Sequence, residues 1–218
     1  MKPAETMEST SQQQAKAQLR PINSLPSLAF DHDEIMTDAI AHYNNFVGNA
    51  LDLSKENLDL ENLKQQSFEG FLTVGDLMTN PHQIPKEQGV YVLILPKNAQ
   101  PTFLTNGTGG FFKDKNPNVD ISELEANWID DTNILYIGKA GGTTNATLQS
   151  RLMQYLKFGM GKKIGHWGGR YVWQLANSRD LIVCWKTTNE NPRDIEKRMI
   201  AEFKAKHNGR RPFANLKD

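Results

Sequence analysis

The sequence contains one cysteine in 218 residues and has no long apolar run. Cys184 alone cannot form an internal disulfide, and its place in the apolar run 181–185 predicts a buried strand residue in a reducing compartment. A membrane-spanning helix needs about 18 or more consecutive apolar residues, and none is present. The N-terminus, Met1–Glu5, also lacks the apolar core of an export signal. We therefore expect a cytoplasmic protein with no membrane partner.

The sequence also lacks a net charge, because 25 Lys and Arg residues balance 25 Asp and Glu residues. This balance hides a difference between two parts of the chain. Residues 1–138 carry 9 basic and 19 acidic residues, whereas residues 139–218 carry 16 basic and 6 acidic residues. A basic face attracts the phosphates of nucleic acid. The asymmetry therefore favours nucleic-acid binding, and the alternative is a fold in which the two parts compensate each other.

The composition, with 38% hydrophobic and 23% charged residues, is that of a globular protein. Residues 1–25 begin with a polar stretch without hydrophobic periodicity, which predicts a mobile N-terminal arm. Residues 26–85 are predicted to form a helical extension, because apolar residues recur at helical spacing from 31 to 50 and a more polar helix is expected from 54 to about 66. Residues 86–218 are then the core domain.

Three strands and two helices are expected in the core domain. Apolar runs predict strands at 89–95, 133–138 and 181–187. One helix is predicted from about 146 to 157, and a second begins at Asn191–Pro192, where Asn caps the helix and Pro takes its first position. We therefore predict an α+β fold with a small, mixed or antiparallel three-stranded sheet flanked by helices.

A connection of 36 residues, 96–131, separates the first two strands. Hairpin loops usually have about two to five residues, so this length requires an explanation. The connection is either an inserted arm that reaches nucleic acid or a second subunit, or a tolerated surface excursion. Its glycine-rich stretch, 106–110, does not qualify as a phosphate-binding loop because no clear helix follows it.

The segment 158–175 combines glycine, basic and aromatic residues. Such a mixture suits a surface that contacts phosphates and stacks on bases. Its basic residues and two arginines near the C-terminus are the predicted nucleic-acid contacts: Lys162, Lys163, His166, Arg170, Arg210 and Arg211. Taken singly, Trp167 and Trp173 are more typical of core residues, and a histidine without a partner is more typical of a structural residue.

Short motifs follow one another in a fixed order through residues 89–215. They are Gly89-Val-Tyr91, Tyr136-Ile-Gly138-Lys139, a helix with Arg151 and Tyr155, a helix with Glu196, and Pro212-Phe-Ala-Asn215. This order resembles the GIY-YIG nuclease superfamily. The second motif and its helix look like the catalytic half of bacterial excision-repair nucleases, whereas the N-terminal layer and the inserted arm look more like the restriction enzymes of the family.

The resemblance implies a divalent-metal-dependent endonuclease that hydrolyses DNA. The catalytic residues that it implies are Tyr91, Tyr136, Lys139, Arg151, Tyr155, Glu196 and Asn215. Glu196 would hold Mg²⁺ or Mn²⁺, because an ion that keeps several waters needs few protein carboxylates. Arg151 would hold the scissile phosphate through its planar guanidinium.

The phenols are assigned to the attacking water. Tyr91 or Tyr136 would accept its proton, although a phenol with a pKa of about 10 is a poor base near neutrality unless a cation lowers that pKa. Lys139, three residues beyond Tyr136, is the expected cation. Tyr155 would orient water or phosphate. The closing asparagine is taken as Asn215, although Asn208 lies nearer the expected distance from Glu196.

Two classes of function stay open. The first is an endonuclease that cuts double-stranded DNA in the manner of a type II restriction enzyme, as a homodimer or by successive nicks. The second is a non-catalytic or structure-specific nucleic-acid-binding module that retained the fold. The joint presence of two tyrosines, an arginine and a carboxylate favours the enzyme, because a binding module has no need of a metal-ligating carboxylate.

Overall fold

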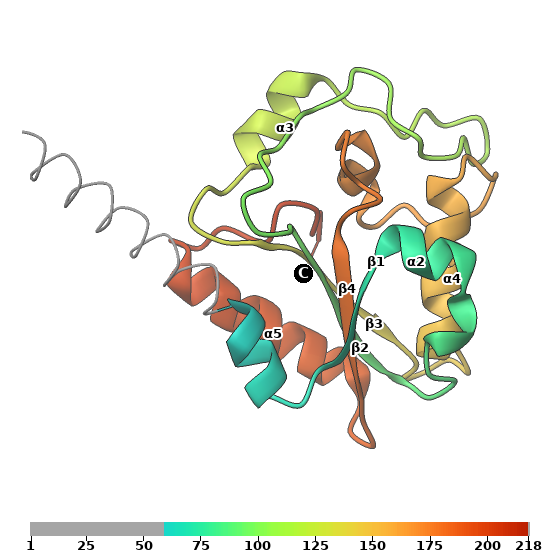
Figure 1. Cartoon of the computed structure of the whole chain (residues 1–218), viewed down its shortest axis with the longest axis vertical. Helices are drawn as coiled ribbons and strands as arrows, with labels where there is room; N and C mark the ends of the chain where they lie inside the picture. The colour runs from blue at the N-terminus through green and yellow to red at the C-terminus, as the bar shows by residue number, and fades with distance from the viewer. Residues whose placement is uncertain (1–58, 218) are drawn as a thin grey trace, which may run out of the picture. The chain divides into compact units, whose positions relative to one another are not determined.

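The computed structural model describes residues 59–217, and the structural statements below concern this part of the chain. The predicted N-terminal arm at 1–25 and the helix at 31–50 lie outside it. The elements, in chain order, are β1 (Glu69–Thr73), α2 (Val74–Thr79), η1 (Pro81–Gln83), β2 (Gly89–Ile94), α3 (Ile121–Asn127), β3 (Ile134–Ala140), α4 (Leu148–Gly159), η2 (Arg170–Gln174), β4 (Ile182–Thr187) and α5 (Pro192–Lys206) (Figure 1). Residues 59–65 are also helical. The fold is α+β, as predicted.

The four strands form one antiparallel sheet in the order β1-β4-β2-β3. The prediction of three strands is therefore wrong by one. The missed strand, β1, lies within the stretch assigned to the helical extension, where its glycine and its short length hid the strand pattern. It becomes a strand by pairing with β4, with Leu72 opposite Val183. Such a long-range partner is not visible in a local sequence window.

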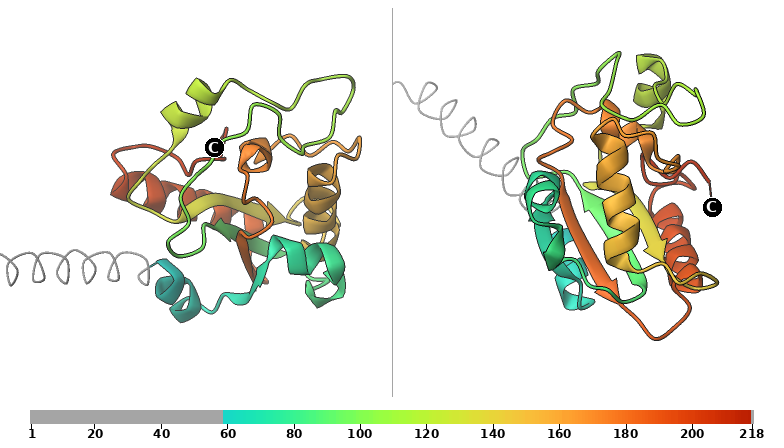
Figure 2. Two further views of the ribbon diagram at one scale, coloured as in Figure 1. Left: turned by 45° about the horizontal axis from the view of Figure 1, so that its top comes forward. Right: turned by 90° about the vertical axis from the view of Figure 1, so that its right-hand side faces the viewer.

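Helices cover both faces of the sheet (Figures 1 and 2). The face beneath α2 and α4 carries Tyr91 and Leu93, and the face beneath α5 and the helical residues 59–65 carries Val92 and Cys184. Successive strand residues point to opposite faces, so a strand covered on both sides becomes apolar throughout. β2 is buried at every position for this reason. The prediction that Cys184 is a buried strand residue is confirmed.

The two long helices begin at well-formed caps. The side chains of Thr147 and Ser150 form a reciprocal capping box at the start of α4, which begins two residues later than predicted. At the start of α5, the Asn191 side chain accepts a hydrogen bond from the Arg193 N–H at 3.1 Å, and Pro192 takes the first position, as predicted. No helix between residues 59 and 217 is both long and apolar enough to cross a membrane.

The long connection between β2 and β3 folds back onto η2. The Gln174 amide donates hydrogen bonds to the carbonyls of Leu104 and Val119, and its side-chain oxygen accepts from the Val119 N–H. The Gly107 backbone lies so close to Trp173 that a Cβ at position 107 would fall 2.3 Å from the Trp173 carbonyl oxygen. The base of the inserted arm is therefore packed into the domain.

Candidate functional site

A hollow of about 300 Å³ opens beside the C-terminal end of β3. Its lining residues are Tyr136, Lys139, Ala140, Gly141, Thr144, Ala146, Arg151 and Glu196. Four of the predicted catalytic residues are among them: Tyr136 and Lys139 from β3, Arg151 from α4 and Glu196 from α5. The other lining residues were not singled out in the sequence, although the loop that carries them directly follows the Tyr-Ile-Gly-Lys motif.

The sheet order explains why these elements meet. β3 is an edge strand, so α4 on one face and α5 on the other both reach it, and Figure 2 shows β3 between the two helices. Arg151 lies in the first turns of α4, and Glu196 lies in the second turn of α5. Both helices therefore direct their N-terminal parts, which carry partial positive charge, toward this end of the strand. Such an arrangement favours an anionic ligand.

Two consecutive glycines turn the chain out of β3. Gly141 and Gly142 have φ angles of 96° and 84°, a backbone conformation that side chains with a Cβ rarely adopt. A Cβ at Gly141 would also lie 2.5 Å from the Gln88 Cβ, and one at Gly142 would lie 3.0 Å from the Asn191 side-chain oxygen. This turn therefore brings the end of β3 against the cap of α5.

The predicted tyrosines form a stack behind the hollow. The ring centroids of Tyr91 and Tyr136 are 5.9 Å apart, and those of Tyr136 and Tyr155 are 6.3 Å apart with nearly parallel planes. Tyr91 and Tyr155 are 0% exposed, whereas Tyr136 is 7% exposed and lines the hollow. Tyr136 is therefore the phenol that a ligand in the hollow can contact, and the other two support it from behind.

The environment keeps all three phenols protonated near neutral pH. Burial raises the pKa of Tyr91, Tyr136 and Tyr155 above the ordinary value of about 10. The Glu196 carboxylate raises the pKa of Tyr136 further, while the Arg151 guanidinium lowers it. The sequence predicted that Lys139 lowers the pKa of a phenol. In the structure Arg151, and not Lys139, has this effect on Tyr136.

Lys139 acts on the carboxylate. Burial raises the pKa of Glu196, and the charges of Lys139, Arg151 and Arg193 oppose that rise. Glu196 is half-buried. Arg193 was missed in the sequence, although its place three residues before Glu196 on the same helix puts both on one face.

A metal ion at this site would rest on one protein carboxylate. No group of three or more His, Cys, Asp and Glu side chains is arranged to hold a metal ion within residues 59–217. Glu196 is the acidic side chain among those that line the hollow. A Mg²⁺ or Mn²⁺ ion that keeps most of its waters and takes further oxygens from a phosphate fits such a site. The side chains of Lys139 and Arg151, which also line the hollow, would hold the phosphate that completes the coordination of the ion.

Asn215 supports β3 from outside and does not line the hollow. Its side-chain oxygen accepts a hydrogen bond from the Ile137 N–H at 2.9 Å, and its amide donates to the Ile137 carbonyl at 2.8 Å. The outer groups of an edge strand otherwise lack partners in the sheet. Asn215 is thus a positioning residue for the strand of Tyr136, which corrects its placement among the catalytic residues. Asn208 is exposed just beyond the end of α5.

The predicted nucleic-acid contacts have different environments. Lys162 and Lys163 are exposed, and the Arg170 guanidinium lies 5.0 Å from the Trp167 ring. His166 is 1% exposed, and burial together with the Arg151 charge lowers its pKa to about 3. The placement of His166 at a DNA-contacting surface is therefore corrected, because a buried, neutral imidazole presents no charge to phosphate.

The two tryptophans and the two C-terminal arginines lie in different environments. Trp173 is a core residue as expected, but Trp167 is 37% exposed, so the core interpretation of Trp167 is wrong. Arg210 donates hydrogen bonds to the carbonyls of Ala126 and Trp128 at 2.8 and 2.9 Å. It therefore fastens the end of the inserted arm to the C-terminal segment. Arg211 is exposed.

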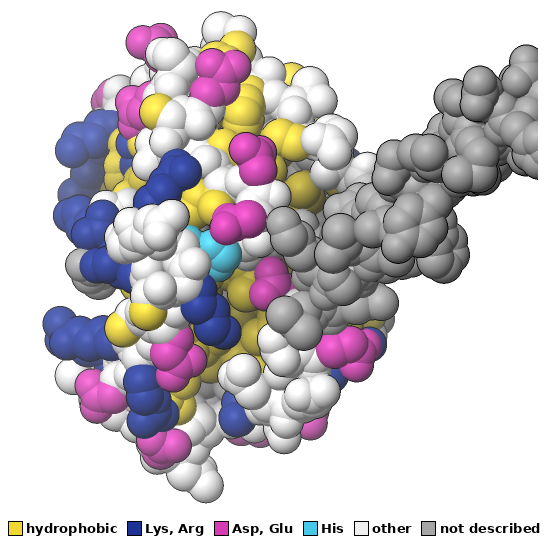
Figure 3. All heavy atoms as spheres, turned by 90° about the vertical axis from the view of Figure 1, so that its left-hand side faces the viewer, with side chains coloured by type: hydrophobic (Ala, Val, Ile, Leu, Met, Phe, Trp, Pro, Cys, Tyr) yellow, Lys and Arg dark blue, Asp and Glu magenta, His cyan; other side chains and the backbone are white. Residues whose placement is uncertain are grey.

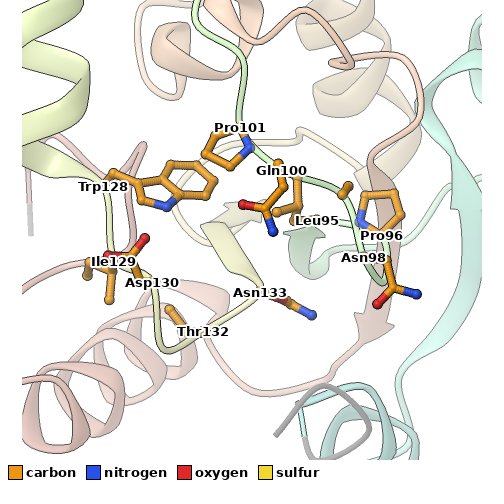
Figure 4. A pocket seen from close by; sticks show the side chains of 11 residues that line it. Leu95, Pro96, Asn98, Gln100, Pro101, Trp128, Ile129, Asp130, Thr132 and Asn133 are labelled. Atoms are coloured by element: carbon orange, nitrogen blue, oxygen red, sulfur yellow. The ribbon is translucent and has the colours of Figure 1, made fainter. Parts of the chain in front are cut away.

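A second hollow, of about 230 Å³, lies at the opposite end of β3 (Figure 4). Trp128 and Pro101 form one side, and Asp130 and Asn133 lie on the other. Its lining includes none of the predicted catalytic residues and no arginine or lysine. A phosphate ester would therefore find no counter-charge there, and the hollow beside Glu196 is the better candidate.

The buried phenols predict a loss of stability at alkaline pH. Tyrosines in the unfolded chain ionise near pH 10, whereas the folded state resists ionisation of Tyr91, Tyr136 and Tyr155. Their contribution to stability is complete below pH 10 and is lost as the pH rises toward their folded pKa values. In a titration, tyrosinate absorbance from these residues should appear together with the loss of circular dichroism. Ionisation of all of them near pH 10 with an intact dichroism spectrum would contradict the burial.

Comparison of the chain with protein-family models, with curated proteins and with solved structures gives no match. A functional conclusion therefore depends on the site itself.

Proposed function

We propose that this protein is a divalent-metal-dependent endonuclease that hydrolyses DNA phosphodiester bonds, like the GIY-YIG nucleases that its motifs resemble. The observation that carries the proposal is the convergence of Tyr136, Lys139, Arg151 and Glu196 on one hollow from three separate elements. Two cations, one phenol and one carboxylate are the groups needed to bind a phosphate, position a water and hold a metal ion. Their convergence is a stronger argument than any of the short motifs.

In this proposal, Arg151 binds the scissile phosphate. A guanidinium offers paired, charge-assisted hydrogen bonds to two phosphate oxygens. The start of α4 adds partial positive charge on the same side. Lys139 favours the ionised form of the Glu196 carboxylate, because its charge opposes the rise in that pKa caused by burial. A cation bound by Glu196 would supply positive charge to the phosphate oxygens and the leaving oxygen, and would oppose the carboxylate's effect on Tyr136.

Tyr136 positions the attacking water. A small fraction of its phenol loses its proton to solvent, and this phenolate takes the proton of the attacking water as the new P–O bond forms, which restores the phenol. The departing oxygen is protonated by solvent. Arg151 shifts the pKa of Tyr136 in the direction that this proton transfer requires, because it stabilises the phenolate over the phenol. Tyr91 and Tyr155 hold the Tyr136 ring in place from behind.

The partner in this proposal is double-stranded DNA in the cytoplasm, where Cys184 stays reduced. Each chain has one such site within residues 59–217, and one site cuts one DNA strand at a time. A duplex is therefore cut by two copies of the chain acting as a homodimer, or by one copy in two successive events.

Incubation of the full chain with supercoiled plasmid tests the proposal. We expect nicked and then linear DNA with Mg²⁺ or Mn²⁺, and intact plasmid with EDTA. Sequencing of the ends then separates two modes: a constant motif indicates restriction-type recognition, and varied ends indicate structural or non-specific cutting. Intact plasmid with both metals, over a range of protein concentrations and pH values, would contradict the proposal.

A second candidate is a module that binds nucleic acid without cutting it. The observation that favours it is the burial of the phenols, since the pKa of each is raised and none is a strong base at neutral pH. In that case the chain would shift the mobility of DNA in a gel but leave it uncut with either metal.

A further inference from the structure

Two segments far apart in the sequence pack together near the hollow. They are residues 107–115 of the inserted arm and residues 157–170, which follow from the end of α4 (Figures 1 and 2). The Gly110 N–H donates to the Phe158 carbonyl at 2.9 Å, and a Cβ at Gly110 would fall 2.0 Å from the Lys162 carbonyl oxygen. The Phe112 ring lies against Gly165, 3.1 Å from where its Cβ would be. We call the exposed parts of these two segments the arm–loop surface.

The arm–loop surface is the place where large apolar side chains are exposed. Among residues 59–217, the exposed large hydrophobic side chains are Phe111 (47%), Met160 (44%) and Trp167 (37%), and all three belong to these two segments. Exposed apolar groups that gather in one place mark an interaction site.

The same surface is strongly basic. Its charged side chains are Lys113, Lys115, Lys157, Lys162, Lys163 and Arg170, with Asp114 as the one acidic residue in the two segments. None of the five lysines forms an ion pair within the described residues. By contrast, Figure 3 shows acidic as well as basic side chains on the face that corresponds to the left-hand side of Figure 1. The arm–loop surface thus offers unpaired positive charge beside exposed rings.

The surface continues to the hollow through Trp167 and its neighbours. A Cβ at Gly168 would lie 3.4 Å from the Tyr136 hydroxyl, so the backbone that follows Trp167 reaches the phenol that lines the hollow. The Arg170 guanidinium lies 5.0 Å from the Trp167 ring and 4.9 Å from the Tyr171 ring. This contact fixes the Trp167 ring in place while part of it remains exposed.

We infer that the arm–loop surface binds DNA that has unpaired bases next to the cleaved phosphate. The inference rests on the proposed DNA-cleaving function and names its substrate class. Lysines attract the phosphates of any DNA. The bases of a duplex, however, are stacked on each other and cannot stack on exposed aromatic side chains. Unpaired bases expose their faces, and stacking on an aromatic side chain strengthens binding by about tenfold or more per base. The combination of rings and lysines therefore fits a bubble, flap or fork better than a fully paired duplex.

The inference is tested by binding the full chain, in EDTA, to two labelled DNAs of equal length. One is a fully paired duplex, and the other has the same sequence with a central unpaired bubble. Fluorescence anisotropy should show roughly tenfold tighter binding to the bubble. Trp167→Ala should remove most of that preference and change the affinity for the duplex by less than about twofold, whereas Trp167→Phe should retain the preference.

Two further variants separate stacking from charge. Phe111→Ala should reduce the bubble preference without changing duplex binding, and it replaces an exposed residue of the arm, so it provides a test independent of the Trp167 environment. Lys162→Ala with Lys163→Ala should weaken binding to both DNAs by similar factors. Equal affinity of the unaltered chain for the two DNAs, or an unchanged preference in both aromatic variants, would overturn the inference. A bubble preference without cleavage in Mg²⁺ would instead reject the endonuclease and retain the surface.

Discussion

Glu196→Gln is expected to lower the rate of Mg²⁺-dependent DNA cleavage by at least about 10²-fold, because it removes the charge that holds the metal ion beside the phosphate. The affinity for DNA should change little, since the basic side chains that attract phosphate remain. The change keeps the size of the side chain. Initial rates of plasmid nicking and gel-shift affinities in EDTA measure the two effects separately.

The same substitution should raise thermal stability. Burial raises the pKa of Glu196, so the folded state disfavours the ionised carboxylate. The contribution of the protonated carboxyl to stability is present at low pH and is lost as the pH rises through the raised pKa, above which the ionised carboxylate lowers stability. A neutral Gln removes that penalty. A higher melting temperature together with lost cleavage is the pattern expected of a functional residue placed at the expense of stability.

Glu202→Gln is the matched control, because Glu202 lies on the same helix but is exposed. It should leave both cleavage and melting temperature nearly unchanged. Equal cleavage by the Glu196→Gln variant and the unaltered chain would reject the role of Glu196 and, with it, the endonuclease proposal.

Gly138→Ala is expected to destabilise the protein by about 3 kcal/mol and to abolish cleavage. A Cβ at this position would lie 2.5 Å from Cζ and 2.7 Å from the hydroxyl oxygen of Tyr91, and 2.7 Å from Cε1 of Tyr136. These rings are buried and cannot swing into solvent. Strand β3 or both phenols must therefore shift, which changes the hollow. For a chain of this size, the melting temperature should fall by roughly 10 °C.

Gly75→Ala provides the control for this prediction. The atoms nearest to a Cβ at Gly75 are 3.5 Å away or more, which is ordinary van der Waals contact, and the residue lies in helix α2, where alanine is favoured. Its melting temperature should be equal or slightly higher. A Gly138→Ala variant as stable and active as the Gly75→Ala variant would show that the glycine is not required for packing under the phenols.

The positions of the main elements were predictable because their signals are local. The apolar runs of β2, β3 and β4 and the spacing of α4 and α5 appear within short windows of sequence. The start of α5 follows from Asn191 and Pro192, since the cap is formed by adjacent residues. Cys184 was predictable as a core residue for the same reason. By contrast, β1 escaped prediction because its strand character depends on pairing with β4.

The candidate site was predictable in part, since four of the seven residues predicted as catalytic line the hollow. The order of the motifs was enough to name Tyr136, Lys139, Arg151 and Glu196, which the fold brings to one hollow. The order could not show that Lys139 opposes the pKa rise of Glu196 while Arg151 lowers that of Tyr136, because these effects depend on distance and burial.

The sequence by itself determined on which elements Tyr136, Lys139, Arg151 and Glu196 lie, because residue type, spacing and capping act over a few positions. Only the tertiary structure decided which of the predicted residues face the hollow. It buried His166, used Asn215 to hold the outer edge of β3, and exposed Trp167. The physical reason is that burial and hydrogen-bond partners come from segments distant in the chain, and β3, as an edge strand, is where α4, α5 and the C-terminal segment meet.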